Sequence, residues 1–156
     1  MIVSFKQLES IRSQHRGQTL VLTSGTFDLF HVGHLDYLEN VKKYGDVLIV
    51  MLSSDKRVKA RKDTNRPIIN EKERARLLDG LKIVDYVFID PSQLSPKEVD
   101  PIHATVLQKL NPDFYITDGP DPRFYNLLDN NKFVILERLH AEPSTTSIIG
   151  KIRNLP

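Results

Sequence analysis

Five short runs of apolar, strand-favouring residues recur along this chain. The runs are mostly unbroken rather than alternating between apolar and polar residues, a pattern typical of strands that are buried on both faces. They cover residues 19–22, 47–52, 84–89, 114–116 and 133–136. We therefore predict five buried strands.

The segments between these strands carry helical signals. Residues 34–44 place apolar side chains three positions apart and end at Gly45, which is a typical helix stop. Asn70 and Glu73 resemble a capping box that opens a helix through residue 81.

Three further helices are predicted nearer the ends of the chain. A cap and first turn at residues 100 and 101 suit a helix over 102–110, and apolar residues 5, 8 and 11 suggest a short helix before the first strand. A last helix opens at Ser144, and we expect its inward side to consist of Ile148, Ile149 and Ile152.

Strands that alternate with helices imply right-handed crossovers and a parallel sheet. The predicted fold is α/β, a single Rossmann-like doubly wound domain over residues 1–156 with a five-stranded parallel sheet. The stretches 55–67 and 119–123 are polar or contain proline, and we expect them to form mobile loops.

Composition narrows the class of protein. The chain has no cysteine, so neither disulfides nor a cysteine-built metal site can support the fold. Its longest apolar run, residues 47–52, is too short to span a bilayer, and its first residues do not resemble a signal peptide. A formal charge of +2 is too mild to indicate a nucleic-acid partner. We expect a cytoplasmic protein that binds neither membrane nor nucleic acid.

The string SGTFDLFHVGH, residues 24–34, joins the first strand to the first long helix. Free N–H groups and the positive end of the helix dipole attract phosphate at such a junction. Gly25 and Gly33 allow the backbone to come close, while His31 and His34 are spaced to direct two imidazoles at one phosphate. Taken singly, either histidine could equally cap the helix or hold a structural metal.

As a whole, this string resembles the signature of the cytidylyltransferase-like nucleotidyltransferases, in which His-x-Gly-His follows Gly-Thr-Phe-Asp. The resemblance extends from about residue 17 to 153 and implies a second phosphate-binding motif at the start of the last helix. Here that segment reads STTS, residues 144–147. Helix capping alone would also explain STTS, but its pairing with the first motif favours phosphate binding.

The resemblance also implies a lysine that reaches the triphosphate from the loop after the second strand. Lys62 fits best, because the order Lys62, Arg66, Pro67 looks like the heptose-phosphate adenylyltransferase pattern, although Lys59 and Arg61 are rivals. A solvated run of charges is the ordinary alternative.

Two arginines complete the comparison. Arg74 matches a family arginine expected near the nucleotide, with surface pairing to Glu71 as the alternative. Arg138 stands where glycerol-phosphate cytidylyltransferases carry an arginine, which suggests contact with the acceptor.

Taken together, the motifs imply that His31, His34 and Lys62 act on the reacting phosphates. The implied nucleotide contacts are Gly25, Thr26, Phe27, Asp28, Gly33, Arg74, Asp118, Ser144, Thr145 and Thr146. Asp28 could orient its loop or approach a metal through water, and we favour the orienting role. Mg²⁺ is the expected cofactor, held mainly by the triphosphate because the sequence offers no dense carboxylate cage.

The implied reaction is transfer of a nucleoside monophosphate from ATP or CTP to a phosphorylated small molecule, with release of pyrophosphate. The acceptor could be a sugar phosphate such as heptose 1-phosphate, or glycerol 3-phosphate or phosphoethanolamine; an FAD synthetase-type adenylyltransferase and a non-catalytic nucleotide-binding module are alternatives. Residues 117–123 depart from the family pattern in a loop that helps select the acceptor, so the substrate stays open. The family also suggests a homodimer and a separate kinase that supplies the acceptor.

Overall fold

A five-stranded parallel sheet forms the centre of the computed structural model, which describes residues 1–62, 65–92, 101–121, 124, 127–136 and 143–155. Its strand order is β3-β2-β1-β4-β5. The strands are β1 (Leu20–Gly25), β2 (Val47–Leu52), β3 (Tyr86–Ile89), β4 (Phe114–Thr117) and β5 (Phe133–Ile135). The predicted five-stranded parallel α/β sheet is therefore confirmed.

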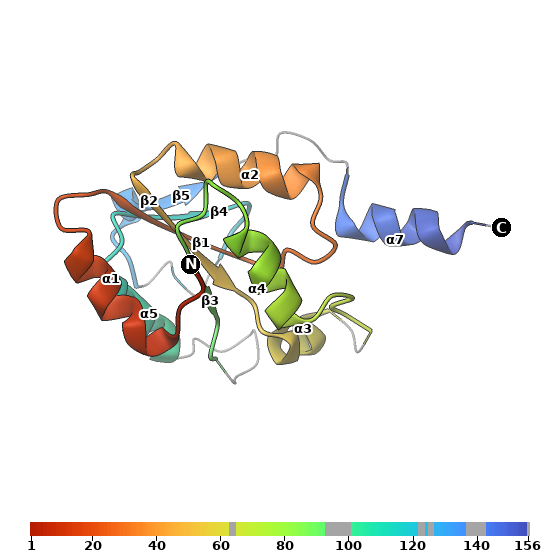
Figure 1. Ribbon diagram of the computed structural model, residues 1–156, viewed down its shortest axis with the longest axis horizontal. Helices are drawn as coiled ribbons and strands as arrows, with labels where there is room; N and C mark the ends of the chain where they lie inside the picture. The colour runs from red at the N-terminus through yellow and green to blue at the C-terminus, as the bar shows by residue number, and fades with distance from the viewer. Residues whose placement is uncertain (63–64, 93–100, 122–123, 125–126, 137–142, 156) are drawn as a thin grey trace.

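Helices cover both faces of this sheet, as Figure 1 shows. They are α1 (Leu8–Gln14), α2 (Val32–Lys42), α3 (Asp55–Arg61), α4 (Glu71–Asp79), α5 (Pro101–Leu110) and α7 (Thr145–Arg153), with 3-10 turns η1 (Phe5–Gln7) and η2 (Asn130–Lys132). All strands are parallel, but β2 and β3 lie on one side of β1 whereas β4 and β5 lie on its other side. The strand order therefore switches between β1 and β4, which are paired neighbours. Ligands of doubly wound sheets bind beyond the strand ends at such a switch point.

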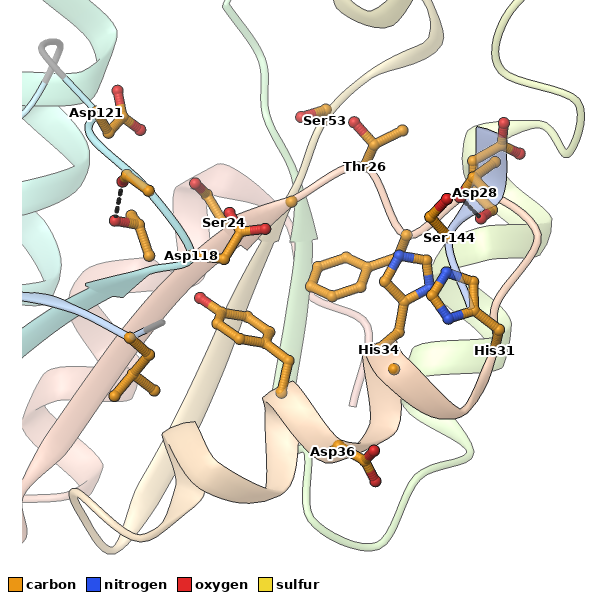
Figure 2. A pocket seen from close by; sticks show the side chains of 18 of the residues that line it. Ser24, Thr26, Asp28, His31, His34, Asp36, Ser53, Asp118, Asp121 and Ser144 are labelled. Carbon is orange, nitrogen blue, oxygen red and sulfur yellow. Dashed lines mark hydrogen bonds between the residues drawn. The ribbon is translucent and has the colours of Figure 1, made fainter. Parts of the chain in front are cut away.

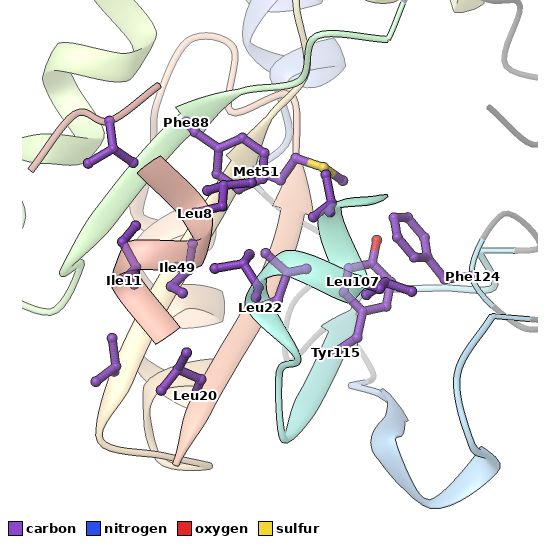
Figure 3. Close-up of a cluster of buried hydrophobic side chains, with 14 residues drawn as sticks. Leu8, Ile11, Leu20, Leu22, Ile49, Met51, Phe88, Leu107, Tyr115 and Phe124 are labelled. Carbon is purple, nitrogen blue, oxygen red and sulfur yellow. The ribbon is translucent and has the colours of Figure 1, made fainter. Parts of the chain in front are cut away.

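Two apolar clusters hold the layers together, one on each face of the sheet. Alternate side chains of β1 enter different clusters: Leu20 and Leu22 pack with α1 and α5, whereas Val21 packs with α2 and α4. Figure 3 shows the first cluster, in which Leu8 and Ile11 of α1 lie against the sheet. Every residue of β2 is buried, which explains why its sequence is an unbroken apolar run.

Several element boundaries differ from the sequence prediction, and β1 for example ends at Gly25 instead of residue 22. The first long helix begins at Val32 instead of residue 34, so His31 is its N-cap residue and His34 lies in its first turn. The third strand begins at Tyr86 instead of residue 84, because Val84 closes a turn with Leu81. Element ends depend on local hydrogen bonds that hydrophobic periodicity does not specify.

Residues 55–61, predicted as part of a mobile loop, form helix α3. The Ser54 side chain caps this helix by accepting a hydrogen bond from Arg57 N, and Asp55 places a negative charge in its first turn. Arg57 and Val58 are buried on one side of the helix. The helix was not predicted because the many basic residues of this segment obscure its short amphipathic pattern.

Helix α7 begins at its predicted cap but does not pack as predicted. None of its residues from 145 to 153 is buried, and the Ile152 side chain is 57% exposed. Figure 1 shows α7 extending away from the sheet. Ile148 and Ile149 are only partly buried, so the expected inward face is incomplete, and it is wrong at Ile152 in this single chain. Among the described residues, no helix is long and apolar enough to cross a membrane.

Candidate functional site

The loop after β1 has an unusual backbone that brings its side chains over the sheet edge. Phe27 and Leu29 both adopt positive φ, at 49° and 45°, which costs a non-glycine residue on the order of 1 kcal/mol. The Phe27 ring folds back over Gly25, where an added Cβ would lie 2.6 Å from a ring carbon. Glycine at position 25 is thus required by the close approach of this ring.

His31 and His34 lie with their rings stacked. Their centroids are 3.9 Å apart and their planes differ by 22°, and both side chains line the same cavity (Figure 2). The rings of Phe27 and Phe30 have centroids 5.4 and 5.5 Å from that of His34 and limit its movement. His31 is the N-cap residue of α2, but its side chain makes no capping hydrogen bond. The two imidazoles are therefore presented together at the start of α2.

Gly33 lets the start of α2 approach the segment that leads into STTS. An added Cβ there would lie 3.2 Å from both the His31 ring and the carbonyl oxygen of Pro143, the residue just before STTS. The N-termini of α2 and α7 consequently open toward one cavity, as Figure 2 shows for Ser144 and the histidines. Two helix N-termini at one cavity create a region that attracts anions.

The STTS segment caps its own helix and also binds the first loop. Ser144 Oγ accepts from Ser147 N at 3.1 Å, and Ser147 Oγ accepts from Ser144 N at 3.0 Å. Thr145 Oγ1 donates to the carbonyl oxygen of Asp28 at 2.8 Å. Capping and attachment to the histidine loop are both present, so the two interpretations of this motif are compatible.

Asp28 orients the chain around it. Its buried carboxylate accepts hydrogen bonds from Ile68 N and Ile69 N at 3.0 Å each and pairs with Arg66 at 3.3 Å. Carboxylate oxygens that already accept several N–H groups are poorly placed to ligate a metal. The geometry favours the orienting role.

Arg74 lies beneath the loop and does not line the cavity. Its guanidinium donates to the carbonyl oxygens of Thr26, Ser53 and Ile69, and it pairs with the Asp55 carboxylate at 2.6 Å. Glu71, its expected surface partner, instead accepts from Asp55 N. The structure therefore gives Arg74 a bracing position rather than the predicted nucleotide contact, because a buried charge must be paired and fully hydrogen-bonded.

Helix α3 directs several cations at the cavity. Lys62, its C-cap residue, lines the cavity, as does Arg61, which also donates to Thr26 Oγ1 at 2.9 Å. Lys59 is exposed and does not line it. Their positions thus favour Lys62 over Lys59 as the predicted phosphate-contacting lysine, while Arg61 remains an alternative.

Arg57 also lines the cavity and was missed by the sequence analysis. Its Nε lies 3.4 Å from an Asp90 oxygen, and its Nη1 donates to Ser92 Oγ at 2.6 Å. The same Asp90 oxygen lies 3.3 Å from His103 Nε2. The four-residue spacing of Arg57 and Arg61 was an available signal, since i and i+4 share one helix face.

Asp90 stays ionised within this buried group. Burial raises the pKa of its carboxyl, but the hydrogen bonds from His103 and Ser92 N and the attraction of His103 and Arg57 outweigh burial and lower this pKa below its ordinary value. An ionised carboxylate can only accept a hydrogen bond. His103 Nε2 therefore carries the proton in its hydrogen bond to Asp90.

The cavity has a volume of about 780 Å³ and lies beyond the carboxyl ends of β1, β2 and β4. Most of the predicted site residues line it: Gly25, Thr26, Phe27, Asp28, His31, Gly33, His34, Lys62, Asp118, Ser144, Thr145 and Thr146. Arg138 and residues 122–123 of the divergent loop lie outside the described residues.

On the side of the cavity near β4, the side chains carry hydroxyl and carboxylate groups. Tyr115 Oη lies 2.7 Å from Ser24 Oγ and donates to Asp121 at 3.0 Å, while Asp118 is exposed at the rim. Thr117 Oγ1 donates to the Gly119 carbonyl oxygen at 2.6 Å and closes the turn between them. Cations and helix N-termini suit phosphates at one end of the cavity, and oxygen acceptors suit hydroxyl groups at the other.

Comparisons with known proteins match most of this chain. A family model described as cytidylyltransferase-like matches residues 22–151. Bifunctional protein HldE of Helicobacter pylori strain G27 is 44% identical over 150 residues, which cover 95% of this chain and 30% of that protein. Bifunctional protein HldE of Aliarcobacter butzleri is 36% identical over 154 residues, or 97% and 31% respectively. The chain thus spans less than a third of the length of these curated relatives.

Solved structures show the same fold. The lipopolysaccharide core biosynthesis protein from Thermoplasma volcanium superposes with a TM-score of 0.61 at 26% identity, over 80% of this chain and all of that one. Pantoate-beta-alanine ligase from Francisella tularensis gives a TM-score of 0.60 at 17% identity, over 99% of this chain and 78% of that one, a likeness of fold alone.

Proposed function

Because this chain belongs to the cytidylyltransferase-like family of nucleotidyltransferases, we propose that it transfers AMP from ATP to a sugar phosphate such as heptose 1-phosphate and releases pyrophosphate. The observation that carries the proposal is the meeting of the His31–His34 pair and the STTS helix start at one cavity that also receives Lys62. The HldE relatives, and the resemblance of the order Lys62, Arg66, Pro67 to the heptose-phosphate adenylyltransferase pattern, favour ATP and a heptose phosphate over CTP and the other acceptors.

In the proposed reaction, an oxygen of the acceptor phosphate attacks the α-phosphorus and pyrophosphate leaves on the opposite side. The acceptor is already an anion at neutral pH, so the protein needs to position the reactants and offset negative charge. The N–H groups at the starts of α2 and α7 bind the phosphate chain, and His31 and His34 donate hydrogen bonds to the phosphate at which charge develops. Lys62 adds a positive charge on the leaving side.

Mg²⁺ fits this site only with the nucleotide present. Within the described ranges, no group of three or more histidine and carboxylate side chains is arranged to hold a metal ion. Mg²⁺ commonly keeps several waters and binds substrate phosphates with one or two carboxylates, and it would supply charge neutralisation on the triphosphate. Asp118 and Asp121 are the carboxylates of this cavity that lie at the end of β4.

Pyrophosphate release tests the proposal directly. ATP and CTP are offered separately with Mg²⁺ to heptose 1-phosphate, glycerol 3-phosphate, phosphoethanolamine and flavin mononucleotide. We expect turnover with ATP and heptose 1-phosphate, and a loss of about 100-fold or more in kcat in His31→Ala, because hydrogen bonds to developing charge contribute about that much. His15→Ala, which alters a histidine outside the cavity, is the matched control.

Other outcomes would replace the proposal. Turnover with CTP, or with a different acceptor, would retain the reaction and change the substrate. Nucleotide binding without pyrophosphate release from any pair would instead indicate a binding module. We further propose that the acceptor comes from a kinase whose active site lies outside these 156 residues.

A further inference from the structure

Arg57 reaches the cavity from a different side than the phosphate motif on α7. Helix α3 follows β2, which lies with β3 on one side of β1, whereas the start of α7 is held at the loop after β1, where Thr145 donates to the Asp28 carbonyl oxygen. Arg57 is anchored at the end of β3, through Asp90 and Ser92. The cavity therefore has a fixed cation at the ends of β2 and β3 and a helix N-terminus at the loop after β1.

The guanidinium of Arg57 is immobilised by a network that joins three elements. The side chains of Arg57, Asp90 and His103 are only 3%, 2% and 0% exposed. Asp90 accepts from Ser92 N at 2.9 Å and from His103 Nε2 of α5 at 3.3 Å, so the partner of Arg57 is itself held in place. A buried guanidinium on such an anchor has a fixed position before any ligand arrives.

The proposed reaction requires a second anion site in this cavity. The acceptor phosphate must approach the α-phosphorus opposite the leaving pyrophosphate, and the two anionic groups repel each other. A cation on the pyrophosphate side does not relieve this repulsion on the acceptor side. Arginine suits a phosphate group because its planar fork presents paired N–H donors.

We propose that Arg57 binds the phosphate group of the acceptor, and that Asp90 and His103 are positioning residues that act through Arg57. The inference rests on the proposed function and adds to it: the acceptor lies on the β2–β3 side of β1, and the triphosphate extends toward α7. Lys62 and the histidines then serve the nucleotide, and Arg57 serves the acceptor.

Two variants of Arg57 test this assignment. Arg57→Lys keeps the charge and loses the planar fork. Arg57→Gln combined with Asp90→Asn removes the charge without leaving a buried carboxylate unpaired. Lys56→Ala is the matched control, since it removes one positive charge from an exposed side chain of the same helix that does not line the cavity.

With ATP saturating, we expect the double variant to raise KM for heptose 1-phosphate by about 10- to 100-fold, the usual effect of losing a charged hydrogen bond. Its Kd for ATP, measured by calorimetry without acceptor, should stay within about twofold of wild type. A merely structural role would not separate the two substrates. An equal loss for ATP, or an unchanged KM for the acceptor, would overturn the proposal.

Direct binding separates this inference from the proposed function. If wild type releases no pyrophosphate, calorimetry with heptose 1-phosphate in the presence of a non-hydrolysable ATP analogue still reads the acceptor site. Binding by wild type that is lost in the double variant and retained in Lys56→Ala supports the inference without turnover. Failure of wild type to bind any phosphorylated acceptor of the panel refutes it.

Discussion

Single arginines in this chain have different roles that their sequence neighbours do not reveal. Arg74 and Arg76 belong to the same helix, α4, yet Arg74 is almost completely buried and Arg76 has a side chain that is 74% exposed. Arg74 donates to three backbone carbonyl oxygens, while Arg76 forms a surface pair with Asp79. This pair of arginines allows a matched test of buried against exposed charge.

Arg74→Ala should lower the free energy of unfolding by about 3–5 kcal/mol, because it leaves Asp55 and buried carbonyl oxygens without their donor. Arg76→Ala should change it by less than about 1 kcal/mol, since exposed ion pairs contribute little. Urea unfolding followed by circular dichroism measures both. A stable Arg74→Ala protein with weakened ATP binding would instead favour the nucleotide contact predicted from sequence.

At the scale of elements, the site depends on how closely α2 and the start of α7 approach each other. A Cβ added to Gly33, in the first turn of α2, would lie 3.2 Å from the Pro143 carbonyl oxygen, which is tighter than ordinary contact. A Cβ added to Gly150, in the middle of α7, would meet open space. Both residues are helical glycines, and only one of them lies at the contact between motifs.

Gly33→Ala should therefore weaken ATP binding by about 10-fold or more, since a displacement of about 1 Å is enough to lose oriented phosphate contacts. Gly150→Ala should leave ATP binding unchanged and stabilise α7 slightly, because alanine is the better helix former by about 1 kcal/mol. Calorimetric titration with ATP compares the two variants. Equal affinity in both would show that the motifs do not need this close approach.

At the scale of the whole molecule, the apolar face of α7 is left uncovered. Ile152 of α7 is 57% exposed and Leu155, just beyond the helix, is 69% exposed, and the N-terminal end of α7 lines the cavity. A helix that carries the proposed phosphate-binding residues must hold its position, and burial of apolar side chains against a second copy would provide that support. This face is consistent with the homodimer that the family resemblance suggests.

We expect wild type to sediment as a dimer and Ile152→Glu to shift it toward monomer, because a buried charge is costly at an interface. Leu77→Glu, at a 49% exposed apolar position of α4, is the control and should remain a dimer. Analytical ultracentrifugation at several protein concentrations measures the equilibrium. A monomeric wild type, or dissociation in Leu77→Glu alone, would rule out α7 as the interface.

The sequence by itself determined the sheet, most helices and the positions of the two predicted phosphate motifs. These features are local: unbroken apolar runs make buried strands, Asn70 and Ser144 cap their helices, and the His-x-Gly-His string is read directly. Their meeting at one cavity followed from the parallel topology, because the strand ends and helix starts of such a sheet share one side.

Only the tertiary structure decided which cationic side chains line that cavity and which ones form ion pairs and hydrogen bonds that stabilise the surrounding loops. Arg57 and Lys59 lie in one basic run, yet the first is buried at the cavity and the second is exposed to solvent. The burial of Arg74 under Thr26 and the exposure of Ile152 depend likewise on segments distant in the sequence. Hydrophobic periodicity specifies which face of a helix is apolar. Only tertiary packing decides which segment contacts this face and which group pairs with a charged side chain.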